Sequence, residues 1–298
     1  MATHHRYAEI MGRQIFYREA GREDASAIVL LHGTPASSHM YRNLIPALSD
    51  RYRVIAPDYP GFGQSERPNV DDFDYTFDAL ADYVDALLDH LGLTRYALYV
   101  QDYGAPVGWR LALRHPERIA AIVTQNGNAY VEGFVGDAME PLFAYGRDRS
   151  NANADALRAL VSLDGIKWQY THGVSDPTLV DPDAWVNAHA AVADTEDAVA
   201  IQLKLFADYL TNVELYPRVH EYLRTSQVPL LAVWGRNDQI FGPDGALAFG
   251  RDLPHADINL LDGGHFLLES RLDAAVALIR PFLARELGSH ARRPAWKP

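Results

Sequence analysis

The chain has 298 residues, with 27 Lys and Arg against 39 Asp and Glu, so its formal net charge at pH 7 is −12. A protein that binds duplex nucleic acid needs a basic face, and we predict no nucleic-acid partner. The one cluster of basic residues, Arg292, Arg293 and Lys297, is expected to be solvated. The absence of cysteine excludes disulfides, thiolate metal sites and a cysteine nucleophile.

Location and assembly are constrained by what the sequence does not contain. The first residues lack the apolar segment of a signal peptide, and no uninterrupted apolar run reaches the roughly 18 residues of a membrane span. We therefore expect a cytoplasmic protein without membrane contact, as a monomer or homodimer. The histidines form no metal-binding pattern, so we expect no metal and no cofactor.

The first half of the chain alternates between short apolar runs and amphipathic segments. Alternating residues at 7–10 and 14–18 predict a hairpin. The runs at 27–31, 52–56, 96–100 and 119–124 predict buried strands. Helices are expected between them, over the apolar residues from Met40 to Leu48, over 76–91, and from about 104 to 114. Strands that alternate with helices of this length indicate a parallel sheet.

The alternation stops near residue 125 and resumes near residue 229. The intervening sequence is rich in Ala, Asp and aromatic residues and shows no convincing strand. Strands are then expected at 229–234 and 257–261, with helices over 246–251 and 266–287. We predict an α/β fold with a mostly parallel, doubly wound sheet and one inserted helical cap. The core would be 1–129 and 223–298, and the cap 130–222.

The turn after the predicted strand at 96–100 has the layout of a nucleophile elbow. Residues 100–105 (VQDYGA) join a strand directly to a helix, and Asp102 occupies the nucleophile position. Gly104 and Ala105 are small enough for the close approach of helix and strand, although Val100 is bulkier than the usual Gly. Taken alone, Asp102 fits a helix N-cap equally well.

Three other loops follow strands in the same way. Residues 32–35 (HGTP) stand where this architecture supplies an oxyanion-hole amide. Asp238 follows the strand at 229–234, and His265 follows the strand at 257–261. Each loop alone is compatible with an ordinary turn, and Asn126, Asn128 and Glu132 are weaker alternatives to Asp238. Together the residues stand in the order nucleophile, acid, histidine at the strand ends where ligands bind in open α/β sheets.

Five motifs carry a resemblance to a known family: 32–35 (HGTP), 58–65 (DYPGFGQS), 100–104 (VQDYG), 234–238 (WGRND) and 264–266 (GHF). The chain resembles the α/β-hydrolase superfamily in its Asp-nucleophile branch, which contains epoxide hydrolases and haloalkane dehalogenases. The resemblance implies Asp102 as nucleophile, Asp238 as acid partner and His265 as base. It also implies an oxyanion hole formed by the backbone amides of Thr34 and Tyr103.

These residue types suit attack on a saturated carbon. A carboxylate is already ionised at pH 7 and needs no base to become nucleophilic. Its attack on a small apolar organic substrate leaves an alkyl ester on Asp102. His265 then deprotonates a water molecule that attacks the ester carbonyl, while Asp238 holds the imidazole tautomer.

The leaving group is less clearly indicated. Dehalogenases of this group hold the halide with indole N–H groups, one from a Trp beside the nucleophile, and carry Asn or Glu where this chain has Thr34. Tyr103 lacks that donor, although Trp168 and Trp185 keep a halide possible. An epoxide needs a proton donor, which cap tyrosines supply in the family, and Tyr170 and Tyr209 are candidates. We expect hydrolysis of an epoxide to a diol, with haloalkane dehalogenation as the alternative and a non-catalytic ligand-binding protein as a remote one.

Overall fold

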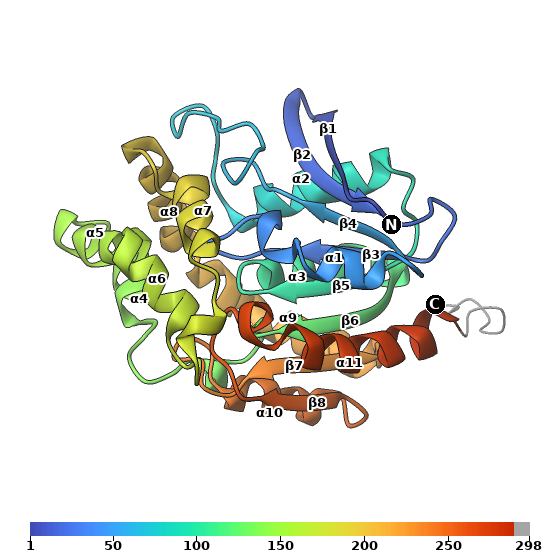
Figure 1. Cartoon of the computed structure of the whole chain (residues 1–298). Coiled ribbons are helices and arrows are strands. Elements are labelled where there is room, and N and C mark those ends of the chain that lie inside the picture. The colour runs from blue at the N-terminus through green and yellow to red at the C-terminus, as the bar shows by residue number, and fades with distance from the viewer. Residues whose placement is uncertain (289–298) are drawn as a thin grey trace.

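The computed structural model describes residues 1–288; the predicted basic cluster at Arg292, Arg293 and Lys297 lies outside this part of the chain. Eight strands form one sheet in the order β1-β2-β4-β3-β5-β6-β7-β8 (Figure 1). The pairs β1–β2 and β2–β4 are antiparallel, and all others are parallel. The strands are β1 (His4–Ile10), β2 (Arg13–Ala20), β3 (Ala27–Leu31), β4 (Arg53–Pro57), β5 (Tyr96–Gln101), β6 (Ile119–Gln125), β7 (Leu230–Gly235) and β8 (Asp257–Leu261).

Helices cover both faces of this sheet. Every residue of β3, β4, β5, β6 and β7 is buried, which explains why these strands are continuous apolar runs. On one face α1 packs against α11. On the other face α2 packs against α3, α3 against α9, and α9 against α10. Their bounds are α1 (Leu44–Leu48), α2 (Phe77–His90), α3 (Gly104–Arg114), α9 (Leu210–Ser226), α10 (Pro243–Asp252) and α11 (Leu267–Gly288).

A helical insertion lies between β6 and β7. Figure 1 shows its helices grouped at the left-hand end of the sheet. They are α4 (Glu140–Arg147), α5 (Asn151–Arg158), α6 (Leu163–Thr171), α7 (Pro182–Val192) and α8 (Glu196–Asp208). The insertion contacts the loops at the carboxyl ends of the strands. For example, Asn237 Nδ2, in the loop after β7, donates a 2.9 Å hydrogen bond to the carbonyl of Gly173 in the insertion. The boundary predicted at 222 falls inside α9, which closes the insertion and also packs on α3 and α10.

The structure confirms the α/β architecture and all of the predicted strands, with ends that differ by up to three residues. Thr76 caps α2, since its Oγ1 accepts a hydrogen bond from the Ala79 N–H. The helix expected from Met40 to Leu48 is wrong in one respect: it consists of a 3-10 turn at Ser38–Tyr41 followed by α1. None of the helices within residues 1–288 is long and apolar enough to cross a membrane.

Candidate active site

Asp102 occupies a tight turn between β5 and α3. Its backbone is left-handed, with φ of 48°, a conformation that Asp tolerates better than most residues. Two glycines allow the close contacts of this turn: Gly104 within it, and Gly33 in the loop after β3. A Cβ on Gly104 would lie 1.9 Å from the Leu31 carbonyl oxygen, and a Cβ on Gly33 would lie 2.4 Å from Asp102 Oδ1. The chain therefore makes a tight strand-to-helix turn here, and the turn holds the Asp102 side chain buried.

The two carboxylate oxygens of Asp102 have different surroundings. Oδ1 accepts a 2.7 Å hydrogen bond from the Thr34 N–H, and the Tyr103 N–H also donates to the carboxylate. Oδ2 lies 3.8 Å from His265 Nε2. Burial raises the pKa of Asp102, while the charge of His265 and the two N–H donors oppose that rise. Oδ1 is thus held by the Thr34 amide, and Oδ2 faces the imidazole.

The imidazole of His265 is oriented by Asp238. Its Nδ1–H donates a 2.8 Å hydrogen bond to Asp238 Oδ2, and Asp238 Oδ1 accepts 2.7 Å from the Ile240 N–H. Burial by itself would lower the pKa of His265, but the carboxylates of Asp238 and Asp102 outweigh burial and raise it. A proton fixed on Nδ1 leaves the Nε2 lone pair on the side of Asp102.

Two further residues complete this cluster: Asn126, and Gln101, for which the sequence predicts no role. Asn126 Nδ2 donates 2.7 Å to Asp238 Oδ2, and its Oδ1 accepts 2.9 Å from the Gly235 N–H. Gln101 Nε2 donates 3.0 Å to His265 Nε2. Asn126, an alternative acid from the sequence, is therefore a partner of Asp238 and not its substitute. Both residues are polar at the end of fully buried strands, which is the signal that could have singled them out.

The other alternative acids lie elsewhere. Asn128 bonds to the backbone of Tyr130 through both ends of its amide. Glu132 pairs with Arg251 at 2.6 Å, and both side chains are solvent-exposed.

The two predicted tyrosines differ in where their hydroxyls lie. The Tyr209 ring packs 6.2 Å from Tyr103 and 5.9 Å from Phe77, beside the nucleophile turn. Burial raises the pKa of Tyr209 well above its usual value, as do its hydrogen bond to Tyr216 and the charge of Asp102. Tyr170 instead donates to the Pro35 carbonyl at 3.5 Å. Of the two predicted tyrosines, Tyr209 is the one whose pKa is raised by the charge of Asp102.

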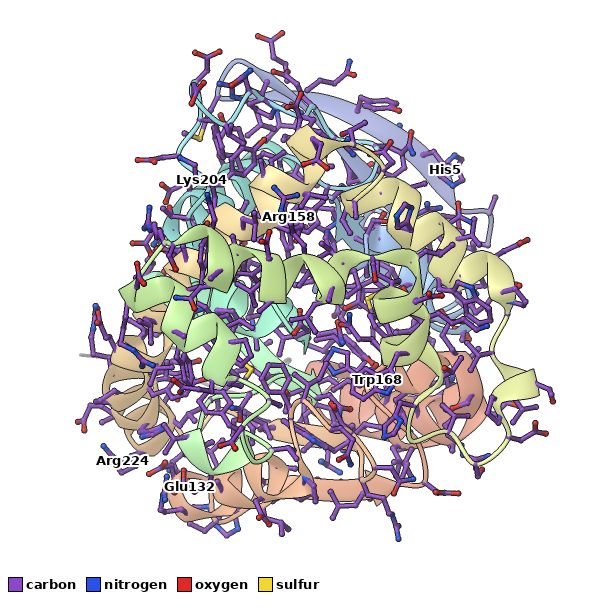
Figure 2. All side chains as sticks on the ribbon, turned by 90° about the vertical axis from the view of Figure 1, so that its left-hand side faces the viewer. His5, Glu132, Arg158, Trp168, Lys204 and Arg224 are labelled. Atoms are coloured by element: carbon purple, nitrogen blue, oxygen red, sulfur yellow. The ribbon has the colours of Figure 1, made fainter. Side chains whose placement is uncertain are left out.

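The structure does not bring Trp168 into the cluster. Its side chain is 44% exposed and stacks on His172, on the face of the insertion seen in Figure 2. Trp185 lies against the ammonium group of Lys167, with 5.7 Å between that nitrogen and the ring. The indole N–H groups of Trp109 and Trp234 donate to the backbone carbonyls of Asn128 and Phe241.

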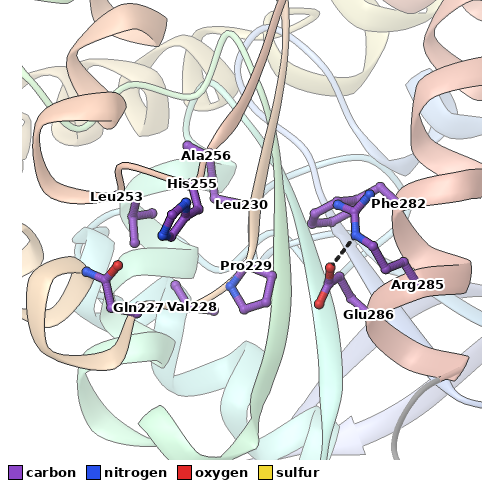
Figure 3. Close-up of a pocket in the computed structure, with 10 residues that line it drawn as sticks. All are labelled: Gln227, Val228, Pro229, Leu230, Leu253, His255, Ala256, Phe282, Arg285 and Glu286. Atoms are coloured by element: carbon purple, nitrogen blue, oxygen red, sulfur yellow. Dashed lines mark hydrogen bonds and ion pairs between the residues drawn. The ribbon is translucent and has the colours of Figure 1, made fainter.

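A cavity of about 380 Å³ opens at the opposite edge of the sheet. It is bounded by Pro229 before β7, by His255 and by the paired Arg285 and Glu286 of α11 (Figure 3). None of its lining residues belongs to the cluster around Asp102, so the cavity is not where that carboxylate would react. Among residues 1–288, no group of three His, Asp or Glu side chains is arranged to hold a metal ion.

Comparison with known proteins places the chain in a family. A model of the α/β-hydrolase fold matches residues 26–272. The chain belongs to the α/β-hydrolase fold family. An uncharacterized hydrolase of Saccharomyces cerevisiae is 41% identical over 277 residues, covering 92% of this chain and 94% of the yeast protein. A cis-3-alkyl-4-alkyloxetan-2-one decarboxylase of Xanthomonas campestris is 30% identical, covering 92% and 93%.

Solved α/β-hydrolase structures agree with the fold described above. A haloalkane dehalogenase of Bradyrhizobium elkani superposes with a TM-score of 0.80 at 25% identity, covering 97% of this chain and 100% of that one. An epoxide hydrolase of Vigna radiata superposes with a TM-score of 0.74 at 24% identity, covering 95% and 98%. The chain is therefore an α/β-fold hydrolase that has a haloalkane dehalogenase among its relatives and shares its fold with an epoxide hydrolase.

Proposed function

We propose that this hydrolase forms a covalent alkyl ester on Asp102 and that its substrate is an epoxide, which it converts to a diol. The observation that carries the covalent step is the asymmetry of the Asp102 carboxylate. Oδ1 accepts the Thr34 N–H, whereas Oδ2 faces His265. Attack through Oδ2 leaves Oδ1 as the carbonyl oxygen of the ester, already in contact with the Thr34 N–H, a donor that stabilises an oxyanion.

The reaction balances with the groups present. Asp102 Oδ2 bonds to an epoxide carbon, the C–O bond breaks, and the ring oxygen takes a proton from the Tyr209 hydroxyl. His265 then removes a proton from water as the water attacks the ester carbonyl. The tetrahedral intermediate expels the diol oxygen, which receives the proton of His265. The proton left on the Asp102 carboxyl returns to the Tyr209 oxygen.

An oxygen leaving group is favoured by the surroundings of Tyr103. This residue stands beside the nucleophile, and the rings of Phe77 and Tyr209 pack against it. Of these two, Tyr209 has a hydroxyl that can donate a proton. The decarboxylase relative is named for an oxetan-2-one, which like an epoxide is a strained oxygen ring. Haloalkane dehalogenation is the second candidate, because a haloalkane dehalogenase shares the fold across nearly the whole chain.

The test is to trap the ester. In His265→Phe the base is absent, so alkylation remains possible while hydrolysis of the ester stops. Intact-protein mass after incubation with epoxides, chloroalkanes and bromoalkanes identifies the chemistry. An adduct with the whole mass of the substrate indicates ring opening, and an adduct of substrate minus hydrogen halide indicates dehalogenation. No adduct from any compound on a folded variant would contradict the proposed function.

A matched pair of tyrosine variants tests the proton donor. Tyr209→Phe should slow adduct formation with epoxides by about 100-fold, the lower end of general acid catalysis. Tyr170→Phe removes an equally buried hydroxyl that is bonded to a backbone carbonyl, and it should leave that rate nearly unchanged. The reverse result would assign the proton to Tyr170.

A further inference from the structure

A buried glutamine of the insertion, Gln202, is linked to the nucleophile through Thr34. Gln202 is on α8 between Ile201 and Leu203, and its side chain has no solvent exposure. An amide in such a position lowers stability unless its polar atoms are hydrogen-bonded. Both Oε1 and Nε2 of Gln202 therefore need a hydrogen-bond partner.

Among residues 1–288, only one end of this amide has a hydrogen-bond partner. Gln202 Oε1 accepts a 2.8 Å hydrogen bond from the hydroxyl of Thr34. The backbone N–H of the same Thr34 donates 2.7 Å to Asp102 Oδ1. Gln202 Nε2 is buried and has no hydrogen-bond partner. A buried unpaired donor costs about 1–3 kcal/mol, which a ligand atom could offset.

The Thr34 hydroxyl sets the direction of the amide. Since Oε1 is held by that hydroxyl, Nε2 is the end of the amide left to bind a ligand, and Thr34 is the one residue between this amide and the reacting carboxylate. The negative charge that develops on a leaving atom needs an N–H or O–H donor close to the nucleophile. Thr34 cannot be that donor, because its N–H is directed at Asp102 and its hydroxyl at Gln202.

We propose that Gln202 Nε2 donates a hydrogen bond to the leaving atom of the substrate as Asp102 is alkylated. The inference rests on the proposed function, and it adds a residue from α8 to the groups of the nucleophile turn. The leaving atom is the ring oxygen of an epoxide, or a halide if the second candidate holds. For an epoxide, Gln202 stabilises the charge on the oxygen while Tyr209 supplies the proton.

Gln202 is expected to affect alkylation of Asp102 and not hydrolysis of the ester. Gln202 acts while the bond to the leaving atom breaks, so it contributes to alkylation. Hydrolysis of the ester uses the Thr34 and Tyr103 amides and His265, and does not involve Gln202 Nε2. A purely structural role, in which Gln202 only holds the Thr34 loop, would instead affect both half-reactions, because the Thr34 N–H serves the second one.

The experiment measures each half-reaction in Gln202→Met, which keeps the length of the side chain and removes its N–H. Alkylation is followed by intact mass in the His265→Phe background with an epoxide, a chloroalkane and a bromoalkane. It should slow about 10- to 100-fold, less than the full effect of an oxyanion-hole donor because Tyr209 shares the charge. Ester hydrolysis, followed by rapid quench in the enzyme with His265, should change less than about twofold. The compound that shows the loss identifies the leaving atom.

Two further variants serve as a matched control and as an independent test of the role of Gln202. Gln169→Met removes a buried glutamine of α6 that donates only to backbone carbonyls, and it should leave both rates unchanged. Thr34→Val removes the hydroxyl that orients Gln202 and keeps the backbone N–H, so it should also slow alkylation selectively, and it serves if Gln202→Met does not fold.

The other results overturn the inference in distinguishable ways. Equal losses in alkylation and hydrolysis would show that Gln202 supports the Thr34 loop. An unchanged alkylation rate would show that Nε2 does not touch the leaving atom. The absence of any ester in His265→Phe itself would overturn the proposed function, and the inference with it.

Discussion

Asn126 offers the sharpest test of how the cluster is held together. The variant Asn126→Gly keeps the left-handed backbone, φ 45°, which glycine adopts freely. It removes the 2.7 Å bond to Asp238 Oδ2 and the 2.9 Å bond from the Gly235 N–H. A hydrogen bond to a charged group contributes about 1.5–3 kcal/mol and a neutral one about 1 kcal/mol. We expect the free energy of unfolding to fall by about 2–4 kcal/mol.

Urea denaturation of Asn126→Gly measures this loss of stability. A second variant, Asn126→Asp, tests through the pH dependence of its stability whether residue 126 acts on the charge of Asp238. Asn126→Asp is isosteric but places a second carboxylate against Asp238, so the buried pair shares a proton and its pKa is raised above that of the unfolded chain. The folded variant then binds more protons than the unfolded one, and its stability falls as pH rises, by up to about 1.4 kcal/mol per pH unit. Asn126→Gly within about 0.5 kcal/mol of the wild type would refute this account.

Three further predictions concern the reacting groups. Asp102→Asn should have no turnover and an unfolding free energy at pH 7 no lower than that of the wild type, because it replaces a buried carboxylate whose pKa is raised with a neutral amide. Ester hydrolysis should speed up as pH rises, because His265 must be neutral to act as base and Asp238 still favours the imidazolium once Asp102 is esterified. In Gln101→Glu the midpoint in rapid-quench data should move upward, because a carboxylate at Nε2 also favours the imidazolium. Gly33→Ala should lower kcat about 100-fold, because its Cβ would displace Asp102 Oδ1 from the Thr34 amide, whereas Gly250→Ala, whose Cβ meets only Ile258 at 3.7 Å, should not.

The sequence predicts the core of this fold because local signals there agree with the tertiary structure. Strands such as β5 are apolar runs bounded by turn residues, and Asp102, Asp238 and His265 follow three of them. Parallel strands end at one edge of a sheet, so their loops meet there. That geometry follows from the order of elements along the chain and needs no knowledge of side-chain contacts.

The sequence predicts the insertion less well. Neither the buried face of a short helix nor a contact between side chains far apart in the chain is indicated by neighbouring residues. The sequence predicts both Trp168 and Tyr170 as site residues, but residues two positions apart on a helix point about 200° away from each other. They therefore lie on opposite faces of α6: Tyr170 is buried and Trp168 is exposed. The contact between Gln202 and Thr34 joins residues 168 positions apart, and no periodicity indicates it.

The charges of the cluster explain how one imidazole can serve a two-step reaction. Before alkylation, the Asp102 carboxylate helps to raise the pKa of His265, and its Oδ2 lies 3.8 Å from Nε2. In the proposed reaction, ester formation neutralises Asp102 and removes that contribution. The imidazole then loses its proton more readily, at the step in which it must be neutral to accept one from water. Asp238 keeps its hydrogen bond to Nδ1 throughout, so the ring stays oriented while its basicity changes.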